Sequence, residues 1–213
     1  MKKLVIFPFN GNGREALDCI NTNEYEFLGF VDDDVEKVSS QYKIFRRDFI
    51  EKYSEIFVLA VPGSSLSYLE RKTIISSLPL KNKKRLVTIV HSTASIGKNV
   101  KIGRNCLIMA GVVLTSNAII GDHVCILPNS IIHHDSTIGD YSLIGSKVVV
   151  AGGAAVGKNC YVGSGSNIMN GLSIGSGSLI GMGSNVLRHV IENTVVAGNP
   201  ARNLRLKRNE KSY

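Results

Sequence analysis

Every sixth residue from Val90 to Val186 is aliphatic, and the series runs without a break in phase. A period of six matches neither the 3.6-residue period of a helix nor the simple alternation of an isolated strand. We therefore predict a chain wound into a prism with short flat walls, one hexapeptide per wall. Each aliphatic side chain is expected to point to the axis and to stack on its counterpart one coil above.

Two further regularities agree with such a prism. A mostly small side chain stands two places before each aliphatic residue, where a corner leaves little internal room. Glycine directly follows many of the aliphatic residues, and we expect it to permit a sharp corner through positive φ. These glycines are Gly97, Gly103, Gly121, Gly139, Gly145, Gly157, Gly163, Gly175 and Gly181. The pattern predicts a parallel β-helix, in which each buried aliphatic side chain contributes roughly 1.5–3 kcal/mol.

Residues 1–84 lack this repeat and alternate between short apolar runs and helical patterns. Strands are predicted at 2–7, 26–31, 42–45, 56–61 and 85–90. Helical segments are predicted at 14–21, 49–53 and 65–78, the last with Ser64 as its N-cap. This order predicts a small parallel sheet, a Rossmann-like half. The predicted domains are an α/β unit over 1–84 and a β-helix with a C-terminal tail over 85–213.

A glycine-rich loop follows the first predicted strand. Gly11, Gly13 and Ala16 match the pattern G-x-G-x-x-[GA] between a strand and a helix, and Asp32 and Asp33 follow about twenty residues later. In nucleotide-binding folds such a loop holds phosphate and the acids hold ribose hydroxyls. The domain has room for one mononucleotide half, so a nucleotide sugar fits better than NAD. A glycine turn without a ligand is the alternative.

Two histidines and an acid stand in the middle of the repeat, directly after the inward position Ile132: His133, His134 and Asp135. These side chains should face outward, where a dry prism gives histidine no packing role. A carboxylate beside an imidazole orients the ring and makes it more basic, which suits a general base. A solvated polar corner is the competing interpretation.

Composition narrows the possible partners and compartments. The 213 residues include no Trp, and no apolar run approaches the length of a membrane span. The N-terminal apolar segment leads straight into the glycine loop, so we predict a cytoplasmic protein rather than a secreted one. The net charge of +8 lies partly in 81–85 and in the tail 202–211. No aromatic interleaving accompanies it, so nucleic acid is not expected, whereas a small polyanionic cofactor could use part of this charge.

Cysteine and histidine spacing gives no sign of a disulfide or a metal site. Cys19, Cys106, Cys125 and Cys160 show no C-x-x-C spacing, and Cys106 and Cys160 fall on the small inward positions. Prism-type carbonic anhydrases hold zinc with three histidines, but no H-x-x-x-x-H occurs here. We therefore predict no metal.

The repeat resembles that of the hexapeptide-repeat acyltransferases, with the pattern [LIV]-G-x-x-[STAV]-x. The resemblance implies a left-handed prism, although parallel crossovers are usually right-handed. The whole chain is similar to the two-domain sugar acyltransferases of the bacillosamine N-acetyltransferase and sialic acid O-acetyltransferase family (PglD-like and NeuD-like). The similarity lies in residues 11–13, 29–33, 130–139 and 198–201.

This resemblance implies roles for particular residues. His134 maps to the catalytic base, Asp135 to its acidic partner, and Asp32 and Asp33 to the nucleotide-sugar pocket together with loop residues that we take as Asn10, Gly11 and Asn12. Acetyl-CoA is expected to contact Gly152, Ser164, Met182 and Leu143. Two of these depart from the family, which has a second His at the position of Leu143 and Gly at that of Met182.

The predicted function is acetyl-CoA-dependent N-acetylation of the amino group of a nucleotide-linked amino sugar. The resemblance also implies a homotrimer with the coenzyme in a groove between subunits. O-acetylation of a sugar or sialic acid hydroxyl is the alternative, and a non-catalytic nucleotide-binding solenoid is the second. An amine is favoured because it needs less polarisation of the acyl group, and Leu143 cannot polarise it.

Overall fold

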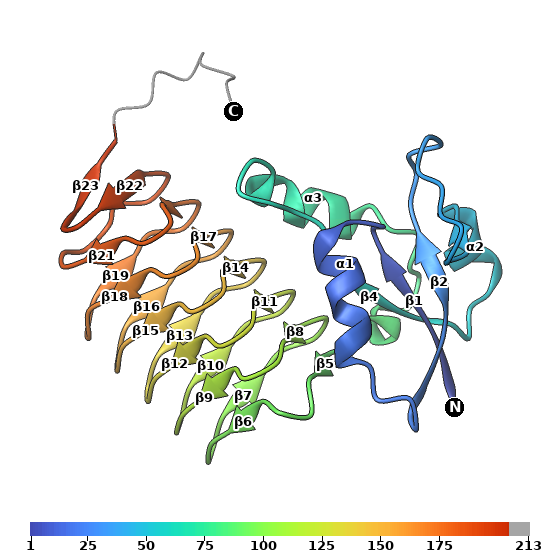
Figure 1. The fold of residues 1–213 in the computed structure, drawn as a ribbon, viewed down its shortest axis with the longest axis horizontal. Helices are drawn as coiled ribbons and strands as arrows, with labels where there is room; N and C mark the ends of the chain where they lie inside the picture. Colours follow the sequence, from blue (N-terminus) through green and yellow to red (C-terminus); the bar gives the residue numbers. More distant parts are fainter. Residues whose placement is uncertain (205–213) are drawn as a thin grey trace.

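The computed structural model describes residues 1–204 and places an α/β unit beside the first coils of a long prism (Figure 1). All strands of the α/β sheet are parallel, in the order β3-β2-β1-β4. They are β1 (Lys2–Phe7), β2 (Tyr25–Val31), β3 (Ile44–Phe45) and β4 (Phe57–Ala60). The helices are α1 (Gly11–Glu15), α2 (Asp48–Lys52) and α3 (Arg71–Ser76), with 3₁₀ turns at Ala16–Cys19, Tyr68–Glu70 and Lys83–Arg85.

Three of the predicted element boundaries in the α/β unit are wrong. The first helix begins at Gly11 because the Asn10 side chain caps it, accepting from the Gly13 amide at 2.7 Å. Ser64 caps no α-helix: its hydroxyl accepts from Leu66 N at 3.2 Å, and the predicted helix over 65–78 is regular only from Arg71. The predicted strand over 85–90 shortens to Ile89–Val90, because Arg85 closes a 3₁₀ turn.

The prism has three faces, each a sheet of two-residue parallel strands. Face 1 contains β5 (Ile89–Val90), β8 (Leu107–Ile108), β11 (Cys125–Ile126), β14 (Leu143–Ile144), β17 (Tyr161–Val162) and β20 (Leu179–Ile180). Face 2 contains β6 (Ser95–Ile96), β9 (Val113–Leu114), β12 (Ile131–Ile132), β15 (Val149–Val150), β18 (Asn167–Ile168) and β21 (Asn185–Val186). Face 3 contains β7 (Lys101–Ile102), β10 (Ile119–Ile120), β13 (Thr137–Ile138), β16 (Ala155–Val156) and β19 (Ser173–Ile174).

The aliphatic series forms the interior of the prism, as predicted. Ile126 pairs with Ile144, so one coil takes 18 residues and each aliphatic side chain meets the one 18 places on. Val90 and Ile96 are partly exposed, because no coil lies beneath the first. The hydroxyls of inward-facing serines donate hydrogen bonds to neighbouring main-chain carbonyls; Ser136 Oγ, for example, donates to Ala151 O at 2.9 Å. The last coil is covered by β22 (Val195–Gly198) and β23 (Ala201–Asn203).

The predicted reason for the glycines was wrong. The positive φ at a corner belongs to the residue three places after the inward aliphatic, as at Asp135 (59°), and not to the glycine directly after it. That glycine is needed because the next coil passes close by. A Cβ built on Gly139 would lie 2.6 Å from the carbonyl carbon of Gly157. Close approach between coils, rather than backbone freedom, therefore accounts for glycine there.

The two units share a core and a buried polar contact. Outward-facing Leu107, Cys125 and Leu143 of face 1 pack in one cluster with Leu4 and Phe30 of the α/β sheet. Polar links join the units at the edge between faces 3 and 1. Asn105 makes hydrogen bonds of 2.7 and 2.8 Å to Ala60, and buried Arg71 donates to Tyr141 O at 2.8 Å and to His123 O at 2.7 Å. No helix within residues 1–204 is long and apolar enough to cross a membrane.

Candidate active site

The predicted base and its acid form a close pair at the edge between faces 2 and 3. They lie at the corner that joins β12 to β13, with His134 Nδ1 at 2.8 Å from Asp135 Oδ2. Both side chains are well exposed, at 64% and 58%. The other Asp135 oxygen accepts from Asn117 Nδ2 at 2.9 Å, one coil below. The hydrogen bond from His134, followed by that from Asn117, lowers the pKa of Asp135 from its ordinary value.

This pairing determines which nitrogen of His134 is free. An ionised carboxylate can only accept hydrogen bonds, so the hydrogen of the neutral ring lies on Nδ1. Nε2 is then the unprotonated nitrogen. Gly152 lies beside it, one coil above: a Cβ built on Gly152 would be 2.5 Å from Nε2. Gly153 and Gly171 have open space where a side chain would be, so the edge above the base is unobstructed. The arrangement suits proton abstraction from a group held above the ring.

A cavity of about 360 Å³ lies at the junction of the two units. Asn10, Gly11 and Asn12 from the loop after β1 form one side. The segment 63–65 after β4 forms another, and Asn12 Nδ2 donates to Gly63 O at 3.3 Å across the two loops. The sheet order reverses between β1 and β4, and ligands of open α/β sheets bind in the crevice at that point. Leu127, Leu143 and Tyr161 of the prism complete the lining.

The predicted acids are near this loop, but neither lines the cavity. Asp32 is only 4% exposed, and its carboxylate accepts from Phe9 N at 2.9 Å, Asp34 N at 3.0 Å and Lys37 Nζ at 2.8 Å. It therefore fixes the loop that carries Asn10. Asp33 is half exposed and pairs with Arg47. Of the two, only Asp33 presents a carboxylate to solvent.

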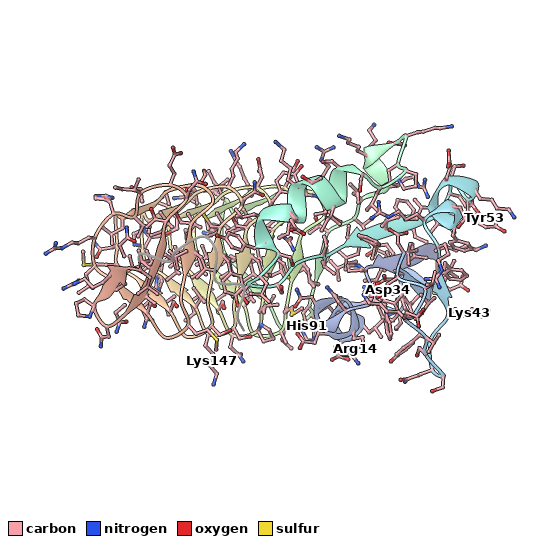
Figure 2. All side chains as sticks on the ribbon, turned by 90° about the horizontal axis from the view of Figure 1, so that it is seen from above. Arg14, Asp34, Lys43, Tyr53, His91 and Lys147 are labelled. Carbon is pink, nitrogen blue, oxygen red and sulfur yellow. The ribbon has the colours of Figure 1, made fainter. Side chains whose placement is uncertain are left out.

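The predicted acetyl-CoA contacts do not form one groove within a chain. Gly152 lies at the same prism edge as His134, between faces 2 and 3. Ser164 and Met182 lie at a different edge, between faces 1 and 2. Figure 2 shows this second edge by its residues His91 and Lys147, with Arg14 of α1 beside it. Ser164 Oγ accepts from Ser146 N at 3.1 Å, and Met182 is 72% exposed. Leu143 is buried on face 1 and lines the junction cavity.

The base and the junction cavity lie on opposite sides of the prism. The cavity opens over face 1, whereas His134 occupies the one edge that face 1 does not touch. In Figure 1 the face 1 strands β8, β11 and β14 border the α/β unit, and β12 and β13 lie away from it. Within a single chain, therefore, a molecule bound in the junction cavity does not reach His134.

Two hollows lie farther along the prism. One of about 410 Å³ lies on face 2 and has a largely apolar lining that includes Ala151, Met169 and Leu187. The other, of about 250 Å³, lies at the capped end and includes Arg188 and Arg202. The 18-residue period could have shown that both hollows contain residues on the same edge as His134. Residues 152, 170 and 188 follow His134 at one-coil intervals, and Asn170 and Arg188 line the first and the second hollow.

The cysteines are buried free thiols, and burial raises the pKa of Cys125 to about 12 and that of Cys106 to about 11. Within residues 1–204, no three His, Cys, Asp or Glu side chains are grouped to hold a metal ion.

Family models identify the repeat. The bacterial transferase hexapeptide (six repeats) matches residues 117–152, and the hexapeptide repeat of succinyl-transferase matches residues 93–124 and 153–188. Comparison with curated protein sequences gives no match. The predicted relationship to the hexapeptide-repeat acyltransferases, and with it the acyltransferase class, is confirmed.

Solved structures resemble the chain over nearly its full length. The acetyltransferase domain of PglB from Neisseria gonorrhoeae has 20% identity and a TM-score of 0.83, covering 96% of this chain and 100% of that one. PerB from Caulobacter crescentus, solved with CoA and GDP-perosamine, has 20% identity and a TM-score of 0.83, covering 96% and 97%. WeeI from Acinetobacter baumannii has 24% identity and a TM-score of 0.79, covering 94% and 99%. These similarities confirm the predicted fold, a Rossmann-like half followed by a left-handed β-helix.

Proposed function

We propose that the protein transfers an acetyl group from acetyl-CoA to the amine of a nucleotide-linked amino sugar. The observation that carries this proposal is the His134–Asp135 pair, whose Nε2 lies beside Gly152 at an edge left open at Gly153 and Gly171. PerB, which has the same fold, was solved with CoA and GDP-perosamine, and this supports the substrate class. The predicted cytoplasmic location is consistent with both substrates and stays a prediction.

In this mechanism His134 acts on the attacking amine. Nε2 accepts the amine proton as the nitrogen adds to the thioester carbonyl, while Asp135 stabilises the resulting imidazolium through Nδ1. The tetrahedral intermediate then collapses with cleavage of the C–S bond: the acetyl group stays on the sugar nitrogen, and the coenzyme leaves as a thiolate that takes the proton from Nε2 and departs as the free thiol. The tetrahedral oxyanion needs a hydrogen-bond donor close to the base. The Gly152 amide is a candidate, because Gly152 lies beside Nε2 and its amide donates to no acceptor in the part of the chain described by the structure.

The nucleotide sugar is proposed to bind in the junction cavity of one subunit and to reach His134 of the next. The loops after β1 and β4 supply backbone and amide donors for a diphosphate. Asp33 follows directly on Asp32, which binds the Phe9 amide of the loop after β1, and is proposed to serve a ribose hydroxyl. The separation of cavity and base within one chain supports a shared site. The apolar hollow on face 2, with Met169 and Leu187 exposed, supports a neighbouring copy covering that face.

Acetyl-CoA is proposed to lie along the edge that carries His134. Adjacent coils are spaced by about 4.8 Å, so Arg188 lies roughly 14 Å above the base. Arg188 and Arg202 form no ion pair with any acid in the described residues. With the thioester at Gly152, the phosphates of an extended coenzyme would approach these guanidinium groups. Ser164 and Met182 would contact it from the neighbouring subunit.

The test offers acetyl-CoA with a UDP-, dTDP- or GDP-linked 4-amino sugar and with its 4-hydroxy analogue, and follows release of free thiol. Turnover of the amine alone supports the proposal. Faster turnover of the hydroxyl establishes O-acetylation instead, and binding of nucleotide sugar without turnover establishes a non-catalytic solenoid. His134→Ala should lower kcat by about 10²–10⁴. The matched control, His133→Ala, removes the adjacent ring and should leave kcat near that of the wild type.

A further inference from the structure

A column of amide side chains leads up the edge to the proposed base. Asn99, Asn117 and Asp135 occupy equivalent corner positions in successive coils, with φ of 60°, 64° and 59°. Asn99 Nδ2 donates to Asn117 Oδ1 at 3.2 Å, and Asn117 Nδ2 donates to Asp135 Oδ1 at 2.9 Å. The column therefore ends on the acid that holds His134.

Asn117 uses both ends of its amide group in this column. The donor from Asn99 engages the oxygen end of the Asn117 amide, which turns its nitrogen end toward Asp135. Asn117 then occupies one carboxylate oxygen, and His134 occupies the other. Asp135 is exposed, so without a donor on Oδ1 its carboxylate could rotate and lose alignment with the ring.

The corner itself does not require this column. The next two equivalent positions are Gly153 and Gly171, which have φ of 68° and 69° and no side chain. The coils above thus stack without any amide contact at this edge. The side-chain column is present on the approach to Asp135 and stops there, so it serves the acid rather than the stacking of the prism.

We propose that Asn117 is a positioning residue, which orients Asp135 and thereby keeps the His134 hydrogen on Nδ1 and its Nε2 free for the acceptor amine. This inference rests on the proposed role of His134 as base. Asn117 contacts neither substrate in this scheme, so its loss should affect kcat and leave both KM values unchanged.

Glycine variants separate positioning from folding. Asn117→Gly removes the amide and retains a residue that tolerates positive φ, and Asn99→Gly makes the same change one coil farther from the acid. We expect Asn117→Gly to lower kcat by about 3–10-fold, with the acid limb of the kcat/KM profile moving to lower pH. Asn99→Gly should keep kcat within about twofold of the wild type and leave the pH profile in place.

The near-isosteric variant Asn117→Asp gives a second test. It keeps the shape and the left-handed corner but sets a carboxylate against Asp135 in place of a donor. Two facing carboxylates favour sharing one proton, so activity should fall further than in Asn117→Gly at neutral pH and recover partly as the pH is lowered.

The tautomer of His134 can be read without any activity, from long-range ¹H–¹⁵N couplings in histidine-labelled protein. The wild type and Asn99→Gly should show the hydrogen on Nδ1, and Asn117→Gly a mixture of tautomers. An unchanged tautomer in Asn117→Gly, or equal kinetic losses in the two glycine variants, overturns the positioning role. If the wild type fails to acetylate the amino sugar but Asn117→Gly still changes the His134 tautomer relative to the wild type, the proposed function is overturned and the positioning role stays in place.

Discussion

Replacing Gly152 with Ala should disable the base without disturbing the fold. Gly152 is not among the residues with positive φ, so Ala suits its backbone. The added Cβ would lie 2.5 Å from His134 Nε2 and 2.7 Å from Cε1. Carbon and nitrogen atoms prefer about 3.5 Å, so the ring must retreat by roughly 1 Å or rotate away. Because the ring is exposed and flexible, it can move, but it then loses its alignment with Asp135.

The expected result is a fall in kcat of about 10–10²-fold, since a misplaced general base loses most of its advantage. The melting temperature should change by only about 2 °C, because the clash is relieved at a flexible side chain. Gly139→Ala is the matched control. Its Cβ would lie 2.6 Å from backbone of the next coil, at Gly157, which cannot move independently. That variant should lose about 1–3 kcal/mol of stability.

A double variant tests the reasoning directly. If Gly152→Ala acts by displacing His134, then His134→Ala combined with Gly152→Ala should have the activity of His134→Ala alone. The assay is the initial rate of thiol release at saturating substrates, with melting curves for each variant. Additive losses would mean that the methyl group obstructs the coenzyme independently of His134. Full activity in Gly152→Ala would refute the structural account of the base.

Three further outcomes are expected. Light scattering should give a particle of about three chains of 23.1 kDa, and a clean monomer at micromolar concentration would contradict the shared site. Asp33→Asn should raise KM for the nucleotide sugar and leave KM for acetyl-CoA unchanged, whereas equal effects on both would mean that the pocket is misassigned. The double variant Arg188→Ala with Arg202→Ala should raise KM for acetyl-CoA by about tenfold and KM for 3′-dephospho-acetyl-CoA much less. An equal increase in KM for both coenzymes would contradict the proposed contact between these arginines and the 3′-phosphate.

The prism could be predicted from the sequence because each coil repeats one local rule. An inward aliphatic residue at every sixth position is sufficient to place Ile132 inside and His134 outside, and the structure agrees. The six-residue repeat did not, however, reveal why glycine follows the inward aliphatic residues. Crowding between residues 18 apart, such as Gly139 and Gly157, depends on how coils stack and leaves no separate mark on a six-residue pattern.

The α/β unit and the site were less predictable, because tertiary contacts determine them. The buried Arg71 guanidinium donates to Pro62 O of the α/β unit and to Tyr141 O and His123 O of the prism, and no charge pattern in the sequence marks it as an interior residue. Asp32 fits a nucleotide fingerprint, yet Lys37 and the Phe9 amide engage its carboxylate. The placement of Leu143 and His134 on opposite sides of the prism follows only once the number of faces is known.

The buried edge between the two units gives the protein a pH-dependent stability. His123 is 9% exposed, stacks on Tyr141 with ring centroids 4.5 Å apart, and lies 3.1 Å from Asn105 Nδ2 through its Nδ1. Burial lowers the pKa of His123 to about 4; Asp122 opposes this shift, and Arg71 and Arg104 add to it. The folded state therefore holds this imidazole neutral where the unfolded chain would protonate it.

The sign of the effect follows from proton binding. Between pH 6.5 and about 4 the unfolded chain binds more protons at this site than the folded protein, so the free energy of unfolding falls as the pH falls. The stabilisation from keeping His123 neutral is fully present above pH 6.5, and about 3 kcal/mol of the free energy of unfolding is lost by pH 4. His123→Asn keeps a residue that tolerates the φ of 63° and removes the titration. Urea unfolding at intervals across this range should show a shallower pH dependence in His123→Asn than in the wild type or in His91→Asn. An unchanged slope in His123→Asn would place the titrating group elsewhere.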